Sequence, residues 1–302
     1  MQRKTFQLQK KEKPENGIIR VLNVQIDLAC SLCHGPLANI EDSIHEIRKT
    51  IKSIRSVIRL VRFKLGEEKF QEENNKFSNI NLLLAELRRS DALLKTLYFI
   101  FNQPDLDIPV IAEQDLIKYF KREKNRLYRS LAGEKSILKR CSKQLSSAQD
   151  QLPDYLLKGI TPKIILAGLK KTYKSGYKRL KKAIQDPSTE NNHALRKAVK
   201  SLWNQLQVLR VLCPFVIGPY ILSLDRLGDL LGTEHDLAEL EQVIKENSTL
   251  QKKVLHPILS VIKRQRRINQ QSAWKIVGRI YAETPSAFSK RMEVYWDLML
   301  TG

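Results

Sequence analysis

Apolar residues recur every three or four positions along most of the chain, the spacing of one face of an α-helix. Gly and Pro are scarce and cluster between these stretches, and no segment alternates as a half-buried strand would. The pattern predicts helices at about 20–38, 41–64, 70–101, 111–145, 161–185, 188–212, 218–245, 248–270 and 286–300. The expected fold class is therefore all-α.

A nine-residue motif occurs twice, as HEIRKTIKS at 45–53 and as HALRKAVKS at 193–201, 148 positions apart. Each copy is followed by a Leu-rich helix that carries an Asp, Asp91 or Asp236, and then by another long helix. This order predicts two four-helix repeats, 18–150 and 151–270, packed as pseudo-symmetric halves. A basic tail, 1–17, precedes them and a helical tail, 271–302, follows.

The cations of the first motif occupy an unusual position on their helix. At about 100° per residue, their stripe lies only about 120° from the apolar stripe, whereas charges usually lie opposite the core. The stripe contains His45, Arg48, Lys49, Lys52, Arg55, Arg59 and Arg62, and the second copy repeats it with His193, Arg196, Lys197, Lys200 and Arg210. Like charges at this spacing repel each other, and a bound polyanion would offset that repulsion.

Composition extends the picture, because 53 Lys and Arg against 32 Asp and Glu give a formal net charge of +21. Ten cations lie between Lys118 and Lys143 with only two acids, and eight lie between Lys163 and Lys182 with none. A further cluster spans 263–267. Such an excess attracts nucleic acid, an anionic membrane or a phosphate polymer.

The sequence shows no signal for secretion and no segment that could span a membrane. The first 17 residues contain no apolar stretch of the secretory kind, and the longest uncharged run, 211–224, is too short to span a bilayer. We therefore expect a cytoplasmic protein. Cys30, Cys33 and His34 match the c-type haem attachment string, but we expect two small helical residues and no cofactor. Cys141 and Cys213 are expected to be buried thiols.

Several motifs, in this order, resemble the CHAD domain, the conserved histidine α-helical domain. They are His45-x-x-Arg48-Lys49-x-x-Lys52, Tyr173-Lys174-x-x-Tyr177-Lys178, His193-x-x-Arg196-Lys197-x-x-Lys200 and Leu230-Leu231-Gly232-x-x-His235-Asp236. The resemblance covers about 18–270. It implies two four-helix bundles related by a pseudo-two-fold axis, with a basic groove or pore between them that binds inorganic polyphosphate.

The resulting hypothesis is non-enzymatic polyphosphate binding, with association with polyphosphate granules. The resemblance carries over His45, Arg48, Lys49, Lys52, His193, Arg196, Lys197 and Lys200, and Lys174 and Lys178 from the tyrosine motif. Helix geometry adds Arg55 and Arg59, and the basic runs add Arg122, Arg126, Arg264 and Arg267. The chain lacks the E-x-E-x-K string of triphosphate-tunnel domains, so their activity is not expected.

Two alternatives stay open. Basic helices also bind RNA or DNA, although no recognition motif and no aromatic residues within the cationic stripe support this. A metal-dependent phosphohydrolase would use His193, His235 and Asp236 with a distant acid such as Asp297. We expect Asp236 to act as a cap or to pair with a neighbouring cation instead. The two motif histidines either contact the ligand or make a structural hydrogen bond.

Overall fold

The computed structural model describes residues 6–35, 40–104, 106–130, 134–150, 157–246 and 252–301. Over these ranges it contains twelve α-helices, one short 3-10 helix and no strand, which confirms the all-α prediction. The elements are α2 (Pro14–Cys33), α3 (Ile40–Leu60), α4 (Arg62–Leu65), α5 (Glu67–Leu83), α6 (Ala85–Phe101), α7 (Val110–Ser130), α8 (Glu134–Asp150), α10 (Pro162–Gln185), α11 (Thr189–Val208), η2 (Arg210–Leu212), α12 (Pro214–Glu246), α13 (Lys252–Ile280) and α14 (Pro285–Thr301).

Several predicted helix ends are wrong. The predicted helix 70–101 is two helices, because the backbone leaves helical geometry at Leu84, with φ −100° and ψ 6°. Pro214 marks a helix boundary as predicted, but α12 begins at this proline rather than near 218, since proline is tolerated in a first helical turn where the amide needs no partner. The predicted end near 270 is also wrong: α13 continues to Ile280 and crosses the expected start of the C-terminal tail.

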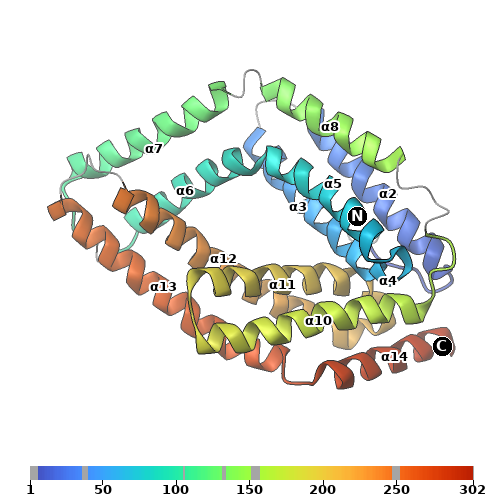
Figure 1. The fold of residues 1–302 in the computed structure, drawn as a ribbon. Helices are drawn as coiled ribbons and strands as arrows, with labels where there is room; N and C mark the ends of the chain where they lie inside the picture. Colours follow the sequence, from blue (N-terminus) through green and yellow to red (C-terminus); the bar gives the residue numbers. More distant parts are fainter. Residues whose placement is uncertain are drawn as a thin grey trace.

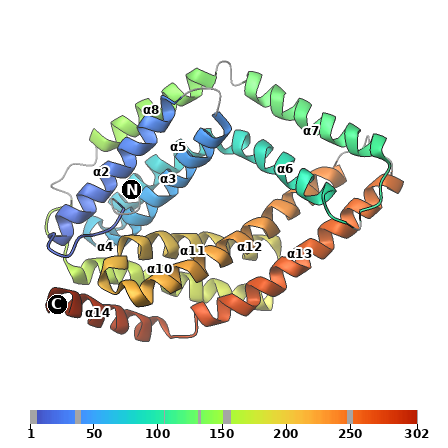
Figure 2. The same ribbon diagram turned by 180° about the vertical axis from the view of Figure 1, so that it is seen from behind.

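The two halves of the chain use the same order of helix contacts. In the first half α2 packs on α3 and α8, and in the second half α10 packs on α11 and α14. Likewise α3 contacts α5 and α6, which lead to α7, while α11 contacts α12, which leads to α13. Figures 1 and 2 show these helices arranged as a ring, with α14 along the outer side of α10.

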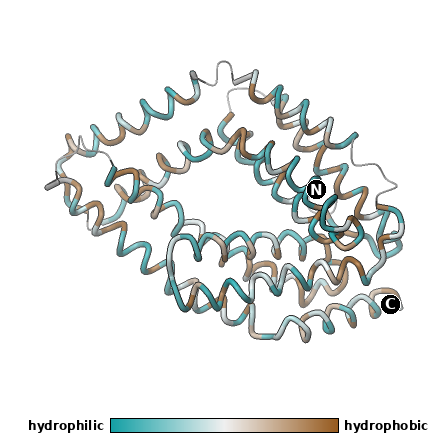
Figure 3. Tube along the Cα trace, in the orientation of Figure 1, coloured by the Kyte–Doolittle hydropathy of each residue, from teal (hydrophilic) through white to brown (hydrophobic). Residues whose placement is uncertain are grey.

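The buried residues do not divide into one core per repeat. One large core combines α2, α3, α5 and α8 with α10, α11, α14 and the first part of α12. A smaller core lies where α6 and α7 meet α13 and the end of α12. Figure 3 shows apolar and polar positions alternating around most helices, as expected for amphipathic helices. The predicted pair of separate bundles is therefore not confirmed.

Close contacts hold α3, which carries the first copy of the motif, against α10 and against α11, which carries the second copy. A Cβ on Gly168 of α10 would lie 2.1 Å from the carbonyl oxygen of Leu60, so only glycine permits this approach. On the other side, the Ser53 hydroxyl donates to Oδ1 of Asn204 at 2.8 Å. Gln205 of α11 donates to the carbonyl of Ser56 at 3.0 Å. The two copies of the motif therefore lie on neighbouring helices.

Candidate functional site

Arg48 and Arg196 occupy the same place in the two copies and share one property. The Nε atom of each is buried and has no hydrogen-bond partner among the described residues. Arg48 donates through Nη1 to the carbonyl of Asn81, in the last turn of α5 just before the break at Leu84. Burial, and then the charge of Arg88, lower the pKa of Arg48 to about 10. Both guanidinium groups are therefore desolvated without a bound carboxylate.

The positive charge of Arg196 is partly compensated by carboxylates that do not contact it. Burial lowers its pKa, and the charges of Asp236 and Asp229 on α12 oppose that shift. No described residue forms a hydrogen bond or an ion pair with its guanidinium. The side chain lies over Gly232, where an added Cβ would be 3.1 Å from Nη2. Asp236 thus acts on Arg196 through its charge alone, and the ion pairs of the described residues do not include the predicted pair between Asp236 and a cation.

Lys52 is the most strongly perturbed cation of the first copy. Its side chain reaches solvent. The protein packed around it nevertheless lowers the pKa of its ammonium to about 7, and the positive charges of Arg196, Arg48, Arg88 and Arg55 add to this effect. The ion pairs of the described residues do not include Lys52. Arg196 belongs to the second copy, so the two motifs share one electrostatic environment.

Arg55 and Arg59 continue the stripe along α3 and share a neutral acceptor. Oδ1 of Asn74 accepts from Nε of Arg55 at 3.1 Å and from Nη2 of Arg59 at 3.2 Å. Burial lowers the pKa of both, and for Arg59, which also feels Arg55 and Arg62, the pKa falls to about 10. An amide oxygen satisfies hydrogen bonds but leaves the positive charge uncompensated.

Two members of the site were not predicted. The charge of Arg88 of α6 acts on Arg48, Lys52 and Arg196. Burial lowers the pKa of Lys197, and the charge of Arg179 of α10 lowers it further, together with Arg55 and Arg196. Arg179 lies three helical turns after Gly168, on the face that meets α3. That spacing could have identified it once the close approach at Gly168 was known. We call the following residues the cationic cluster: Arg48, Lys52, Arg55, Arg59, Arg88, Arg179, Arg196 and Lys197.

The predicted histidines differ in their surroundings. His45 is half exposed, with 49% of its side chain accessible. His193 packs against His235 of α12, with ring centroids 4.1 Å apart. Burial, then His235, and then nearby cations lower the pKa of His193 to about 3. Nδ1 of both rings in this pair is buried without a partner, which places two unsatisfied atoms beside the cationic cluster.

Two predicted cations are already paired. Lys49 is 3.2 Å from Glu46, at the exposed surface of α3. Lys200 lies 3.1 Å from Asp225 and 3.3 Å from Asp229, both on α12. The stem of Lys200 crosses Gly228, where an added Cβ would be 2.5 Å from Cε. These two residues thus differ from the unpaired Lys52.

The remaining predicted cations do not join the cluster. On α10, Lys174 and Lys178 are turned by about 120° and about 80° from the Gly168 face that meets α3. Arg122 and Arg126 lie exposed on α7, where Arg126 is 2.8 Å from Glu123. Arg264 and Arg267 lie exposed on α13, which packs against α12. The four arginines on α7 and α13 were predicted from runs of basic residues, and such runs do not indicate which helix faces pack against each other.

Two buried ion-pair networks anchor the motif helices. In the first half, Lys124 of α7 lies 3.1 Å from Asp91 of α6 and also pairs with Glu41 at the start of α3. In the second, Arg266 of α13 binds Glu234 at 2.8 Å, Glu241 at 2.7 Å and Thr189 of α11 at 3.2 Å. Glu41 and Thr189 are again 148 positions apart. The repeat thus preserves the anchor as well as the motif.

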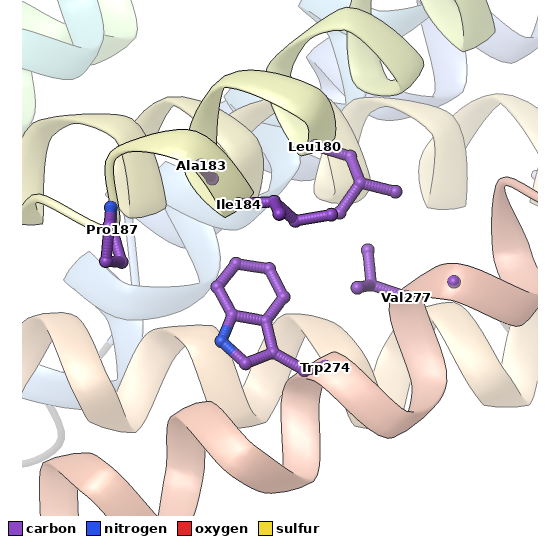
Figure 4. A pocket seen from close by; sticks show the side chains of 7 residues that line it. Leu180, Ala183, Ile184, Pro187, Trp274 and Val277 are labelled. Atoms are coloured by element: carbon purple, nitrogen blue, oxygen red, sulfur yellow. The ribbon is translucent and has the colours of Figure 1, made fainter.

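Other features of the described residues lie apart from the cluster. The described residues contain no group of three or more His, Cys, Asp and Glu side chains placed to hold a metal ion. Nor do they include a helix long and apolar enough to cross a membrane. Figure 4 shows a pocket of about 340 Å³ between α10 and α13, where Trp274 points towards Leu180 and Ile184. Its lining residues include no charged side chain to bind an anion.

The cysteines are free thiols. Cys33 and Cys141 are buried, and burial raises the pKa of Cys33 to about 12. Cys213, expected to be buried, is only partly so, since it lies at the start of α12 near the surface. Nε2 of His34 lies 3.0 Å from the hydroxyl of Ser142, which gives this histidine a structural partner.

Comparison with protein families matches the CHAD domain over residues 32–245, well over half of the 302-residue chain. The match begins near the end of α2, includes both copies of the motif and ends within α12, so α13 and α14 lie outside it. Comparisons with curated proteins and with solved structures gave no match. On the family match, the chain belongs to the CHAD domain family.

Proposed function

We propose that the protein binds inorganic polyphosphate through the cationic cluster, without hydrolysing it. The CHAD domain is associated with polyphosphate binding, and the cluster supplies the matching chemistry. The observation that carries the proposal is the pair of buried, unpartnered Nε atoms at Arg48 and Arg196. Leaving a buried donor unsatisfied costs about 1–3 kcal/mol, and an oxyanion would recover that cost at both places.

The charge distribution supports a linear polyanion over a single phosphate. The cluster draws on α3, α6, α10 and α11. The positive charges of Arg48, Arg55, Arg88, Arg179 and Arg196 each lower the pKa of at least one other member. Six of its eight members are arginines, whose planar groups bind oxyanions in pairs of hydrogen bonds. A polymer with about one charge per phosphate fits several such groups at once.

Nucleic acid is the second candidate ligand. Proteins that bind single strands stack bases on aromatic side chains, each worth about 1–3 kcal/mol. The cation–π contacts of the described residues involve no member of the cationic cluster. This arrangement favours a ligand that offers phosphates alone.

A titration with polyphosphates of increasing chain length, with RNA as competitor at equal phosphate concentration, tests the proposal. We expect affinity to rise with chain length, polyphosphate to displace RNA, and binding to weaken steeply with salt as counterions are released. Displacement of polyphosphate by RNA, or a flat salt response, would contradict it. A phosphate-release assay with added divalent metal ions tests the absence of turnover. Metal-dependent release abolished by Asp236→Ala would favour a phosphohydrolase.

Binding of this kind would also hold the protein on polyphosphate granules in the cytoplasm. Fluorescence microscopy of the tagged protein, with and without the cluster mutations described below, would test this part of the proposal. A diffuse signal for the unmutated protein in cells that contain granules would contradict it.

A further inference from the structure

Lys200 is held by two carboxylates of the neighbouring helix. Its ammonium lies 3.1 Å from Oδ1 of Asp225 and 3.3 Å from Oδ1 of Asp229. These acids are one helical turn apart on α12 and flank Gly228, over which the lysine stem lies. The Asp225 and Asp229 side chains are 46% and 65% exposed, so both can turn away from the lysine into solvent.

The first copy has no such pair. Lys52, at the same place in the repeat, is absent from the ion pairs of the described residues and feels only cations among its principal neighbours. The helix that follows it supplies the backbone carbonyl of Asn81 to Arg48 of the motif and the side-chain amide of Asn74 to Arg55, just after the motif. A pair of carboxylates supplied to the motif by the following helix is thus a property of the second half.

The following inference rests on the proposed binding of polyphosphate. We infer that Asp225 and Asp229 are specificity-determining residues, which compete with the ligand for Lys200 and thereby make the protein discriminate against short phosphates. A short phosphate must displace the carboxylates with little other binding energy. A long chain that is already bound to α3 presents further phosphates to Lys200 at high effective concentration, so it displaces them readily.

The experiment compares tripolyphosphate with a long-chain polyphosphate on the wild type and on Asp225→Asn/Asp229→Asn. Asparagine keeps the shape of the side chain and removes its charge. We expect affinity for tripolyphosphate to rise by about tenfold and affinity for the long chain by about threefold or less, since exposed ion pairs contribute up to about 1 kcal/mol each. Discrimination by chain length should therefore shrink.

A matched control is Asp107→Asn/Asp115→Asn, which removes two exposed carboxylates near and on α7 and changes the net charge equally. An equal gain in the control would show that general electrostatics explains the effect, and the inference would fail. Unchanged or weaker binding by the α12 variant would also overturn it.

Adding Lys200→Gln gives a second, independent test. If the carboxylates sequester the lysine, its loss should cost more affinity in the Asp225→Asn/Asp229→Asn background than in the wild type. Equal costs in the two backgrounds would refute competition. If the wild type binds neither phosphate, the proposed function fails as well. If it binds both and the variants change nothing, only this inference fails.

Discussion

The two copies of the H-x-x-R-K-x-x-K-S motif have nearly the same sequence pattern but different electrostatic surroundings. On α3, Arg48 and Lys52 meet other cations and neutral acceptors. On α11, Lys200 is paired with two carboxylates and Arg196 is attracted to Asp229 and Asp236. The same motif residues are therefore surrounded by a different net charge in the two copies. The following helix supplies amide and carbonyl groups in the first copy and carboxylates in the second.

This difference has a structural origin in the helix that follows each motif. In the second half, α12 is continuous, and Gly228 and Gly232 leave room for Lys200 and Arg196 to lie along its surface beside its acids. In the first half, the corresponding helix is broken at Leu84, and Arg48 donates to a carbonyl beside the break. The first copy thus contributes the stronger field, and we expect it to dominate binding.

Reversing two charges on α3 should have the largest effect. Arg48→Glu with Lys52→Glu removes two cations and places two anions in the cluster, so we expect polyphosphate affinity to fall by more than about a hundredfold. Binding is measured by titration. Helical circular dichroism should stay near that of the wild type, because neither side chain belongs to the apolar core.

The matched control for this reversal is Lys174→Glu with Lys178→Glu, which changes the net charge equally on α10 at two lysines outside the cationic cluster. We expect a loss below about tenfold, caused by the long-range field alone. Equal losses in the two variants would show that the total charge, and not the cluster, binds the ligand. Unfolding of the α3 variant would show that the stripe is structural.

The pH dependence of binding should separate Lys52 from Lys200. The pKa of Lys52 is about 7 in the free protein, and neighbouring phosphates would raise it on binding. Binding above pH 7 then takes up a proton, so affinity should fall by up to about tenfold per pH unit as the pH rises. Below pH 6 the lysine is already charged, and this dependence should vanish.

Lys52→Arg tests this assignment, because a guanidinium stays protonated throughout the range. Titrations between pH 6 and pH 9 should give a flatter profile for this variant than for the wild type. Lys200→Arg is the matched control and should keep the wild-type slope, since it leaves Lys52 in place. The same slope for Lys52→Arg and the wild type would assign the dependence to another group or to the ligand.

Sequence reasoning reached the helices, the repeat and the α3 members of the cluster, since these depend on spacing along one helix. It missed Arg88 and Arg179, which belong to helices outside the motif and approach it only through packing. It also treated Lys200 as free, although its partners are 25 and 29 residues away on α12. The break at Leu84 has no Gly or Pro to mark it.

The smallest effect should come from the glycine under Arg196. Gly232→Ala places a Cβ 3.1 Å from Nη2 and 3.2 Å from Nε, so the guanidinium must shift by a few tenths of an ångström. We expect polyphosphate affinity to change by about threefold or less, because the end of a long side chain adapts easily. Replacing glycine by alanine stabilises an unobstructed helix by about 0.5–1 kcal/mol, and the contact with Arg196 should cancel part of this stabilisation.

Gly278→Ala on α13 is the matched control, because no atom lies within 4 Å of its added Cβ. Chemical denaturation should show the full propensity gain for Gly278→Ala and a smaller gain for Gly232→Ala, with binding unchanged in the control. If both variants gained equally and bound alike, Arg196 would not depend on the surface of α12. The second copy would then owe its weaker field to the acids alone, and the contrast with α3 would rest on Asp225, Asp229 and Asp236 rather than on the close approach that the glycines allow.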